Sequence, residues 1–282
     1  MERKTTNGFF SPRRFGQLLL RDLAGGYRGV LIAMAAVAGV VILLSGLTAL
    51  IQAAANRTAT GGNFHGGFFI ELLFFGGFII TSLTFREARQ NGSAIFYMTL
   101  PASAFEKLVS KLLVTTVGFA VGSLVFFTAT AAASEGLNRL VFGVGHEFFN
   151  PFDPRILRAV GLYLILQSVF LLGSIWFKKT AFVKTALSVA CLVLGVAIFS
   201  GIMARIILAG HMVPTSASHG MVHMGALSLN WTNEFLEGIF GPGGRGYAGL
   251  MAFKLIGQIL FFGLLAPVCW LASYFRLREV EV

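Results

Sequence analysis

Six long runs of apolar residues constrain this chain more than any other feature of its sequence. Each run is close to or above the roughly 20 residues that an α-helix needs to cross about 30 Å of hydrocarbon. Backbone groups in lipid must be hydrogen-bonded within their own segment, which a helix achieves and an open sheet edge does not. The runs are Gly29–Ala54, Gly67–Phe85, Lys111–Ala133, Ala159–Phe177, Thr185–Ala209 and Leu250–Phe275. We therefore expect an all-α polytopic membrane protein with six transmembrane helices, in which residues 1–282 form a single transmembrane domain.

The composition agrees with a membrane protein and argues against nucleic-acid binding. Charged residues make up 12% of the chain and apolar residues 56%, whereas soluble domains carry about 25% charged residues. The net charge of +10 is spread over the segments between the apolar runs, where a basic excess normally reports orientation. This pattern leaves no soluble basic face to hold a duplex. Cys191 and Cys269 lie within apolar runs, and we expect them to pack as small apolar side chains.

The distribution of lysine and arginine predicts the orientation in the membrane. Fifteen of these residues fall in the two termini and in the loops that would share a side with them, and five fall in the opposite loops. Because positive residues are enriched in cytoplasmic segments, we expect both termini in the cytoplasm, and six spans are consistent with both ends on one side. The loop of residues 86–110 then lies in the cytoplasm. The longest connection, the His/Met-rich segment 210–249, lies outside.

Residues 11–23 are predicted to form a short helix along the membrane surface. Ser11 is a suitable N-cap, and Pro12 suits the first helical position. The apolar side chains of this segment fall near one face and its arginines project elsewhere, which is typical of an interfacial helix in contact with lipid headgroups. The amino-terminal stretch lacks an apolar region beside a small-residue cleavage site. We therefore expect an uncleaved first span.

Both ends of the loop of residues 86–110 carry helix signals. The second span is expected to continue as a helix past Arg86 and to end at Asn91–Gly92, a good carboxy-terminal stop. Ser103 and Glu106 form an S-x-x-E capping box, which predicts the start of the helix that leads into the third span.

Between these ends lies a short apolar segment. Ser93 can begin a helix over Ala94–Leu100, and Pro101 would end it. The apolar side chains of this helix would be costly to leave in water as one patch. They lie on the membrane surface or dock into a partner, and we favour a partner. The residues expected to dock are Ile95, Phe96, Tyr97, Met98, Leu100 and Pro101.

The segment FREARQNGSAIFYMTLPASAFEKLVSKLL, residues 85–113, resembles the cytoplasmic loop of permease subunits of ABC transporters in the type-2 exporter class. In many bacterial members a phrase like Y-x-T-L-P-A-S-x-x-E-K joins the second and third spans, and here it reads YMTLPASAFEK. The amino-terminal PRRFGQLLLRDL and the six-span plan are similar to that family too. The His/Met-rich outer loop matches no family element.

The resemblance implies a permease subunit of an ATP-driven exporter in the bacterial cytoplasmic membrane. It implies that Ala94–Leu100 is a coupling helix that docks on a separate ABC ATPase subunit, and that a second permease copy completes a homodimer or heterodimer. ATP and magnesium would then bind the ATPase, so this chain would hold no cofactor and would not itself be an enzyme. The missing G-x-x-x-x-G-K-[ST] motif agrees with this. The alternative is a non-transporting membrane scaffold or sensor that recruits a cytoplasmic partner.

Three ionisable residues are expected inside the spans, at similar depth in the outer leaflet: Glu71, Arg205 and Lys254. Charges inside a membrane tend to pair or to face a cavity. Either Glu71 pairs with one of the two basic residues, or those residues extend toward water. Gly118 and Gly122 form a G-x-x-x-G pattern, which allows two helices to approach closely within the bundle or across a dimer.

Other chemistries fit the sequence less well. It contains neither an H-E-x-x-H nor a G-x-S-x-G motif, so an intramembrane enzyme is the weakest interpretation. His211, His219 and His223 have spacings that only loosely match those of metal ligands. We therefore expect no metal site.

Overall fold

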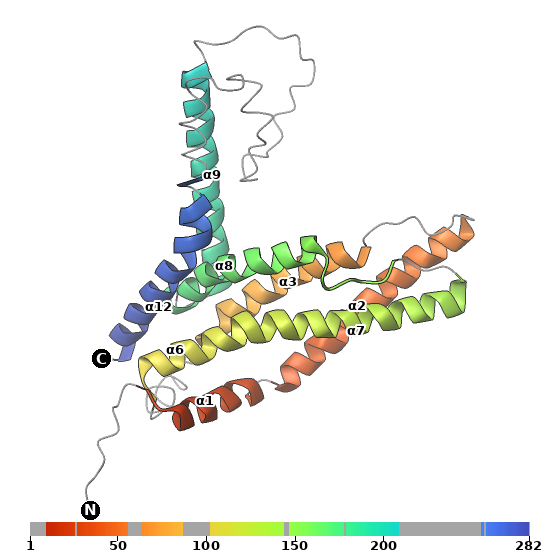
Figure 1. Ribbon diagram of the computed structural model, residues 1–282, viewed down its shortest axis with the longest axis horizontal. Helices are drawn as coiled ribbons and strands as arrows, with labels where there is room; N and C mark the ends of the chain where they lie inside the picture. The colour runs from red at the N-terminus through yellow and green to blue at the C-terminus, as the bar shows by residue number, and fades with distance from the viewer. Residues whose placement is uncertain are drawn as a thin grey trace, which may run out of the picture. The chain divides into compact units, whose positions relative to one another are not determined.

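The computed structural model of the chain is all-helical in the residues that it describes, which are 10–25, 27–55, 64–86, 102–143, 147–177, 179–208, 255–256 and 258–281. The helices are α1 (Pro12–Ala24), α2 (Tyr27–Ala54), α3 (Phe64–Leu83), α6 (Ala104–Leu113), α7 (Phe119–Phe142), α8 (Pro154–Trp176), α9 (Ala181–Leu208) and α12 (Leu265–Glu281), with two π-helical turns, η1 (Val114–Gly118) and η3 (Leu260–Leu264). The all-α class predicted from the sequence is confirmed for these residues (Figure 1).

Five helices in the described part of the chain are long and apolar enough to cross a membrane. They are Arg28–Ala54, Phe64–Leu83, Ala104–Phe142, Pro154–Trp176 and Leu260–Glu279. The predicted fifth span falls on α9, in which the segment Ala181–Val196 is apolar. A multi-pass membrane protein is therefore supported, while the sixth span and the cytoplasmic position of both termini stay predictions.

The third span is longer than the sequence indicated. Instead of Lys111–Ala133, one continuous helical segment runs from Ala104 through η1 to Phe142, 39 residues in all. At 1.5 Å per residue this is about 58 Å, roughly twice the thickness of the hydrocarbon core. The additional turns at its start and end are the parts of this helix that carry most of its buried charged and amide side chains.

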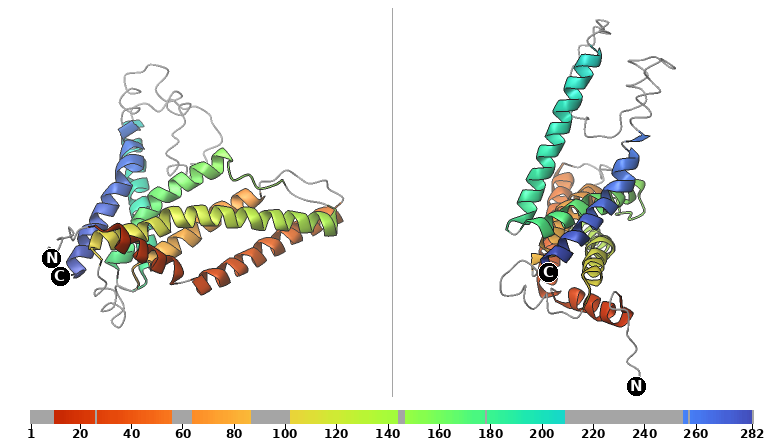
Figure 2. Two further views of the ribbon diagram at one scale, coloured as in Figure 1. Left: turned by 60° about the horizontal axis from the view of Figure 1, so that its bottom comes forward. Right: turned by 90° about the vertical axis from the view of Figure 1, so that its left-hand side faces the viewer.

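The chain divides into two compact units, residues 1–182 with 269–282 and residues 183–268. In the first unit the helices pack mainly as two pairs, α2 with α7 and α3 with α8, and α3 also contacts α7 (Figures 1 and 2). A cluster of buried residues joins these four helices: Val41, Phe69, Leu73, Ala120, Phe127, Ala131, Ile156 and Tyr163. The single-domain assignment made from the sequence stays a prediction.

Aromatic rings fill most of the space between the two helix pairs. The ring centroids of Phe69 and Phe127 are 5.4 Å apart, and Phe149 lies 5.1 Å from Phe127. Phe78 and Phe170 stack with centroids 4.1 Å apart, which joins α3 to α8. Tilted and stacked ring pairs at these separations add about 0.5–1.5 kcal/mol each beyond the area that they bury. Contacts between phenylalanine rings therefore contribute to the packing between α3, α7 and α8.

A second cluster of buried residues brings α12 against α6 and α8. It consists of Phe85, Leu108, Leu171, Ile175 and Leu277. Beside it the Arg276 guanidinium lies 5.2 Å from the Trp176 ring and donates to the Glu279 carboxylate at 2.6 Å. The carboxy-terminal helix is thus fixed to the same end of the unit as α6.

The closest approach between α3 and α8 occurs at Gly77. A Cβ atom on this residue would lie 2.3 Å from Cε2 of the buried Tyr163 ring. Because the ring is enclosed by Phe74, Phe78 and Phe119, it has no free space into which to move. Only glycine fits at this position without displacement of one of the two helices.

Substitution of Gly77 by alanine is therefore expected to lower the free energy of unfolding by about 1–3 kcal/mol, the usual cost of overpacking a core. The thermal midpoint of the purified protein in detergent is the measurement. Gly161→Ala is the matched control, because nothing lies within 4 Å of a Cβ atom at that glycine of α8. Equal midpoints for the two variants would contradict the steric account.

Candidate functional site

The predicted coupling segment lies outside the described residues, but both of its flanks lie partly within them. Ile95, Phe96, Tyr97, Met98, Leu100 and Pro101 belong to the range 87–101, which the structure does not describe. What the structure does describe is the end of α3 on one side and the start of α6 on the other. The geometry of the α6 side forms the candidate functional site.

On the α3 side, the second span does not continue without interruption to Arg86, which is again helical, and the expected end at Asn91–Gly92 lies outside the described residues. The helix α3 ends at Leu83, and Thr84 and Phe85 form a turn. The Thr84 hydroxyl donates to the Ile80 carbonyl at 3.1 Å, and the Thr84 amide bonds to the Thr81 carbonyl at 3.1 Å. Threonine side chains that bond back to the preceding turn often bend a helix, and these two contacts hold the turn that follows α3.

On the α6 side, the capping box predicted from the sequence is present. The Ser103 hydroxyl accepts the Glu106 amide at 3.2 Å, and the Glu106 carboxylate accepts the Ser103 amide through Oε2 at 2.9 Å. Two amide groups that have no partner within the helix are satisfied in this way. The direction of the chain as it leaves residues 87–101 is therefore fixed at the first residue of α6.

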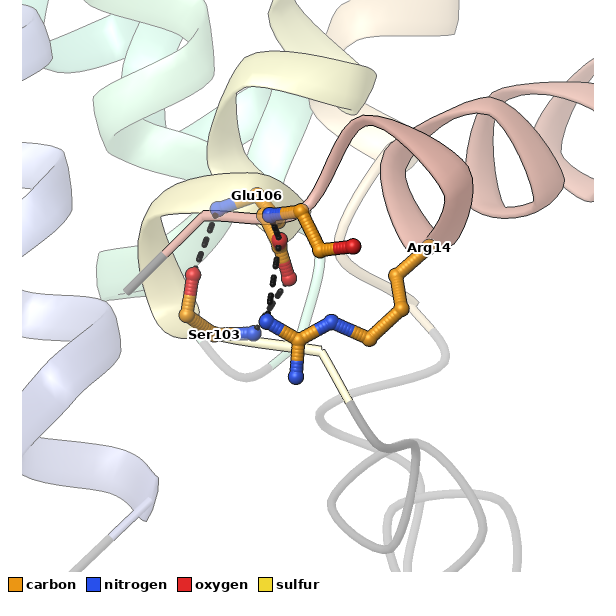
Figure 3. Close-up of polar contacts among 4 residues, drawn as sticks. Arg14, Ser103 and Glu106 are labelled. Carbon is orange, nitrogen blue, oxygen red and sulfur yellow. Dashed lines mark hydrogen bonds and ion pairs between the residues drawn. The ribbon is translucent and has the colours of Figure 1, made fainter. Parts of the chain in front are cut away.

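Glu106 also holds α1, a role that the sequence did not reveal. Its Oε1 atom accepts the Ser11 amide at 2.6 Å and lies 3.4 Å from Nη2 of Arg14 (Figure 3). The Glu106 side chain is 0% exposed. Ser11 is the N-cap residue of α1, as predicted, and Pro12 follows it, but the Ser11 side chain makes no capping bond. The carboxylate of Glu106 caps α1 in its place, at the helix end where the backbone dipole favours a negative charge.

A second polar contact fixes the other end of α1 to α6. Asp22 Oδ1 lies 2.8 Å from Lys111 Nζ, and the Ser110 hydroxyl donates to Asp22 Oδ2 at 2.7 Å. Asp22 and Lys111 are both largely shielded from solvent, at 6% and 13% exposed. Polar contacts at both ends of a 13-residue helix prevent it from pivoting. The predicted interfacial helix and the first turns of α6 therefore form one rigid element, which we call the α1–α6 junction.

A second buried polar cluster, which the sequence analysis missed, joins α2, α3 and α7. His65 Nε2 lies 2.7 Å from Glu135 Oε1, with the two side chains 2% and 0% exposed. The Asn138 amide donates to the Ser45 hydroxyl at 2.7 Å. Both residues lay outside the predicted spans, His65 before the start of the second span at Gly67 and Glu135 beyond the end of the third span at Ala133. Because α3 begins at Phe64 and α7 continues to Phe142, both residues instead lie on packed helices.

The predicted intramembrane charges do not form a site in the described residues. Glu71 is exposed on α3, and it makes no ion pair with any residue whose side chain the structure describes. The side chain of Arg205 and all of Lys254 lie outside the described part. Pairing of Glu71 with either residue stays a prediction.

The G-x-x-x-G pattern of the third span is exposed rather than packed. Nothing lies within 4 Å of a Cβ atom placed on Gly122, and only the Leu113 carbonyl of the same helical segment lies near one on Gly118. No other described helix approaches this face. Packing against a second copy of the chain therefore stays a prediction.

The described residues offer no candidate metal site. Among the described residues no group of three or more His, Cys, Asp or Glu side chains could hold a metal ion. His211, His219 and His223 lie outside that part of the chain.

Comparison of the sequence with protein-family models and with curated proteins, and of the structure with solved structures, gave no match.

Proposed function

We propose that this protein is the membrane-spanning permease subunit of an ATP-driven, exporter-type ABC transporter, coupled to a separate ATPase subunit through residues 86–110. The observation that carries the proposal is the α1–α6 junction, centred on the buried carboxylate of Glu106. A loop that receives force from an ATPase needs a stiff connection to the spans. The junction is such a connection, because its contacts begin at Ser103, three residues after the predicted coupling helix ends at Leu100.

The order of these contacts along the chain predicts how movement of the docked segment would pass to α6 and then to α1. Movement of the docked segment would pull on Ser103 and Glu106, and the capping box would pass the pull to α6 rather than let the first turn unwind. The contacts of Glu106 with Ser11 and of Lys111 with Asp22 would carry α1 along. ATP binding on the partner would thus move α1 and α6 together at the membrane surface.

The resemblance of residues 85–113 to type-2 exporter permeases and the lysine and arginine distribution support the remaining assignments. They favour a location in the bacterial cytoplasmic membrane with residues 86–110 on the cytoplasmic side. A second permease copy and two ATPase subunits, which bind ATP and magnesium, would complete the transporter. The transported substrate is not assigned.

The test of this proposal is co-purification with the ABC ATPase that we expect to be encoded beside this gene. Phe96→Asp and Tyr97→Asp each place a charge on the apolar face that would enter the ATPase, so we expect at least a tenfold loss of captured ATPase, corresponding to about 1.4 kcal/mol or more. Phe152→Asp is the matched control, an exposed aromatic residue in the connection before α8. Capture that is unchanged by the loop substitutions would refute the docking assignment.

The same purified complex can distinguish a transporter subunit from a protein that only recruits an ATPase. A permease should change the ATPase rate of its partner when substrate is added or when the complex is reconstituted in lipid. Stable association with an ATPase rate that never responds would instead favour the scaffold or sensor, because that role needs the docking loop but no path through the bundle.

A further inference from the structure

A wide turn interrupts the long third helix where α6 meets α7. In η1 the Phe119 amide donates to the Val114 carbonyl, five residues earlier, and to the Thr116 carbonyl. In a regular α-helix this amide would bond to the Thr115 carbonyl, four residues earlier. The turn therefore contains one residue more than an α-helical turn, and it leaves the Thr115 carbonyl without its usual donor.

The other wide turn in the described residues has an ordinary local cause. In η3, Leu260–Leu264 precedes Pro267 of α12. A proline ring clashes with the carbonyl of the residue four positions earlier, here Gly263, and a wider turn relieves that clash. The sequence of η1, Val-Thr-Thr-Val-Gly, contains no proline, and none follows it in α7. Its wide turn must have another cause.

Side chains of α8 supply that cause. The Tyr163 hydroxyl donates to the Thr115 carbonyl at 2.8 Å, which gives that carbonyl the donor it lost. The Gln167 amide donates to the Thr115 hydroxyl at 2.8 Å, and that hydroxyl donates to the Lys111 carbonyl at 2.8 Å. Tyr163 and Gln167 are both 0% exposed. The Thr116 hydroxyl also bonds back to Leu112, a local contact that bends helices.

We propose that η1 is a conformational joint, held by Tyr163 and Gln167, about which the α1–α6 junction moves relative to α7. This inference rests on the proposed function, because it names the point at which movement of the coupling loop would be converted into movement of a span. On one side of η1, α6 is fixed to α1. On the other side, α7 packs along α2. The wide turn between them replaces the regular i to i−4 hydrogen bond of the Phe119 amide with one to the Val114 carbonyl, five residues earlier.

Deletion of a single residue can remove the wide turn while leaving the helices on either side of it unchanged. A π-helical turn is an α-helix with one residue inserted, so deletion of Val117 should restore a continuous α-helix and keep α6 and α7 in their present register. Deletion of Val125, an exposed valine of α7 at regular helical geometry, is the matched control. That deletion rotates everything on one side of it by about 100° and separates the packed faces.

The first measurement is the thermal midpoint of the two deletion variants in detergent. We expect the variant lacking Val117 to melt within a few degrees of the parent protein, and the variant lacking Val125 to melt far lower or to fail to assemble. If the two deletions destabilised the protein equally, the turn would not be a removable insertion, and the proposal would be overturned.

The second measurement is the distance between spin labels at Leu20 of α1 and Leu140 of α7, both exposed, with Cys191 and Cys269 replaced by alanine. In the complex with the neighbouring ATPase, we expect addition of ATP and magnesium to shift this distance in the parent protein and not in the variant lacking Val117. A shift that persists in the deletion variant, or no shift in a parent complex that binds the ATPase, would overturn the joint. Failure of the parent protein to bind the ATPase would instead overturn the proposed function and the coupling role, and the melting comparison would still decide whether η1 is an insertion.

Discussion

Replacement of Glu106 by alanine is expected to lower the free energy of unfolding by about 2–4 kcal/mol and to abolish coupling to the ATPase. The substitution removes the charge-assisted bonds that the Glu106 carboxylate accepts from the Ser103 and Ser11 amides, worth about 1.5–3 kcal/mol each before allowance for non-additivity. The other half of the capping box, the bond from the amide of residue 106 to the Ser103 hydroxyl, stays in place. The contact with Arg14 adds little, because it is 3.4 Å long and the arginine is partly exposed.

Two measurements check this prediction. The thermal midpoint in detergent reports stability, and the substrate-dependent ATPase rate of the reconstituted complex reports coupling. Glu279→Ala is the matched control, because Glu279 also pairs with an arginine, at 2.6 Å, but is 63% exposed, and surface pairs are worth about 0–1 kcal/mol. Glu106→Gln should be intermediate, since its amide oxygen can still accept one backbone bond. A loss no greater than that of Glu279→Ala would show that the junction does not depend on Glu106.

The features that depend on local sequence were predicted well. Residue composition over about 20 positions decides whether a segment is apolar enough for a membrane, and each of the five long apolar helices overlaps one of the predicted spans. Ser103 and Glu106 are three residues apart, so the capping box needs only one helical turn to form. The N-cap position of Ser11 and the helical position of Pro12 follow from the same short-range preferences.

The features that depend on tertiary packing were not predicted. Glu106 meets Ser11 across 95 positions of sequence, and His65 meets Glu135 across 70. Rules based on the spacing of residues along the sequence apply over a few helical turns and do not detect contacts at these separations. The S-x-x-E pattern identified one role of Glu106, and the composition of α1 gave no sign that its amino terminus would use the same carboxylate. The wide turn η1 was missed for the same reason, because the donors that stabilise it come from α8.

One error had a local cause that a longer window would have corrected. The third span was ended at Ala133, where the purely apolar run stops. The next residues, Ser134-Glu135-Gly136-Leu137-Asn138, are polar on one face only: Ser134, Glu135 and Asn138 are buried, whereas Leu137 is exposed. Positions 134, 135 and 138 share one helical face. A polar stripe that continues an apolar helix thus marked a buried site rather than the start of a loop.

Replacement of Glu135 by methionine, which removes its carboxylate, is expected to lower the free energy of unfolding by about 2–3 kcal/mol. Breaking a buried ion pair in a soluble protein costs about 3–5 kcal/mol, whereas hydrogen bonds between membrane helices average only about 0.6 kcal/mol and reach about 1.7. The free energy lost when the contact between His65 and Glu135 is broken should fall between these limits. Its short contact of 2.7 Å and its nearly complete burial favour the higher figure. Glu71→Gln on the exposed face of α3 is the control and should leave the thermal midpoint unchanged.

A double-mutant cycle decides whether the stability comes from the pair or from its two members separately. His65→Phe places a ring beside Phe64 and Phe127, whose rings already contact the imidazole, and Glu135→Met fills a similar volume with an unbranched apolar side chain. Replacing both members of a buried pair by apolar groups is often neutral or stabilising. We therefore expect the double variant to melt at a higher temperature than either single variant, with a coupling energy of about 2 kcal/mol. Strictly additive losses would mean that the two groups stabilise α3 and α7 independently, and that the contact between them does not hold these helices together.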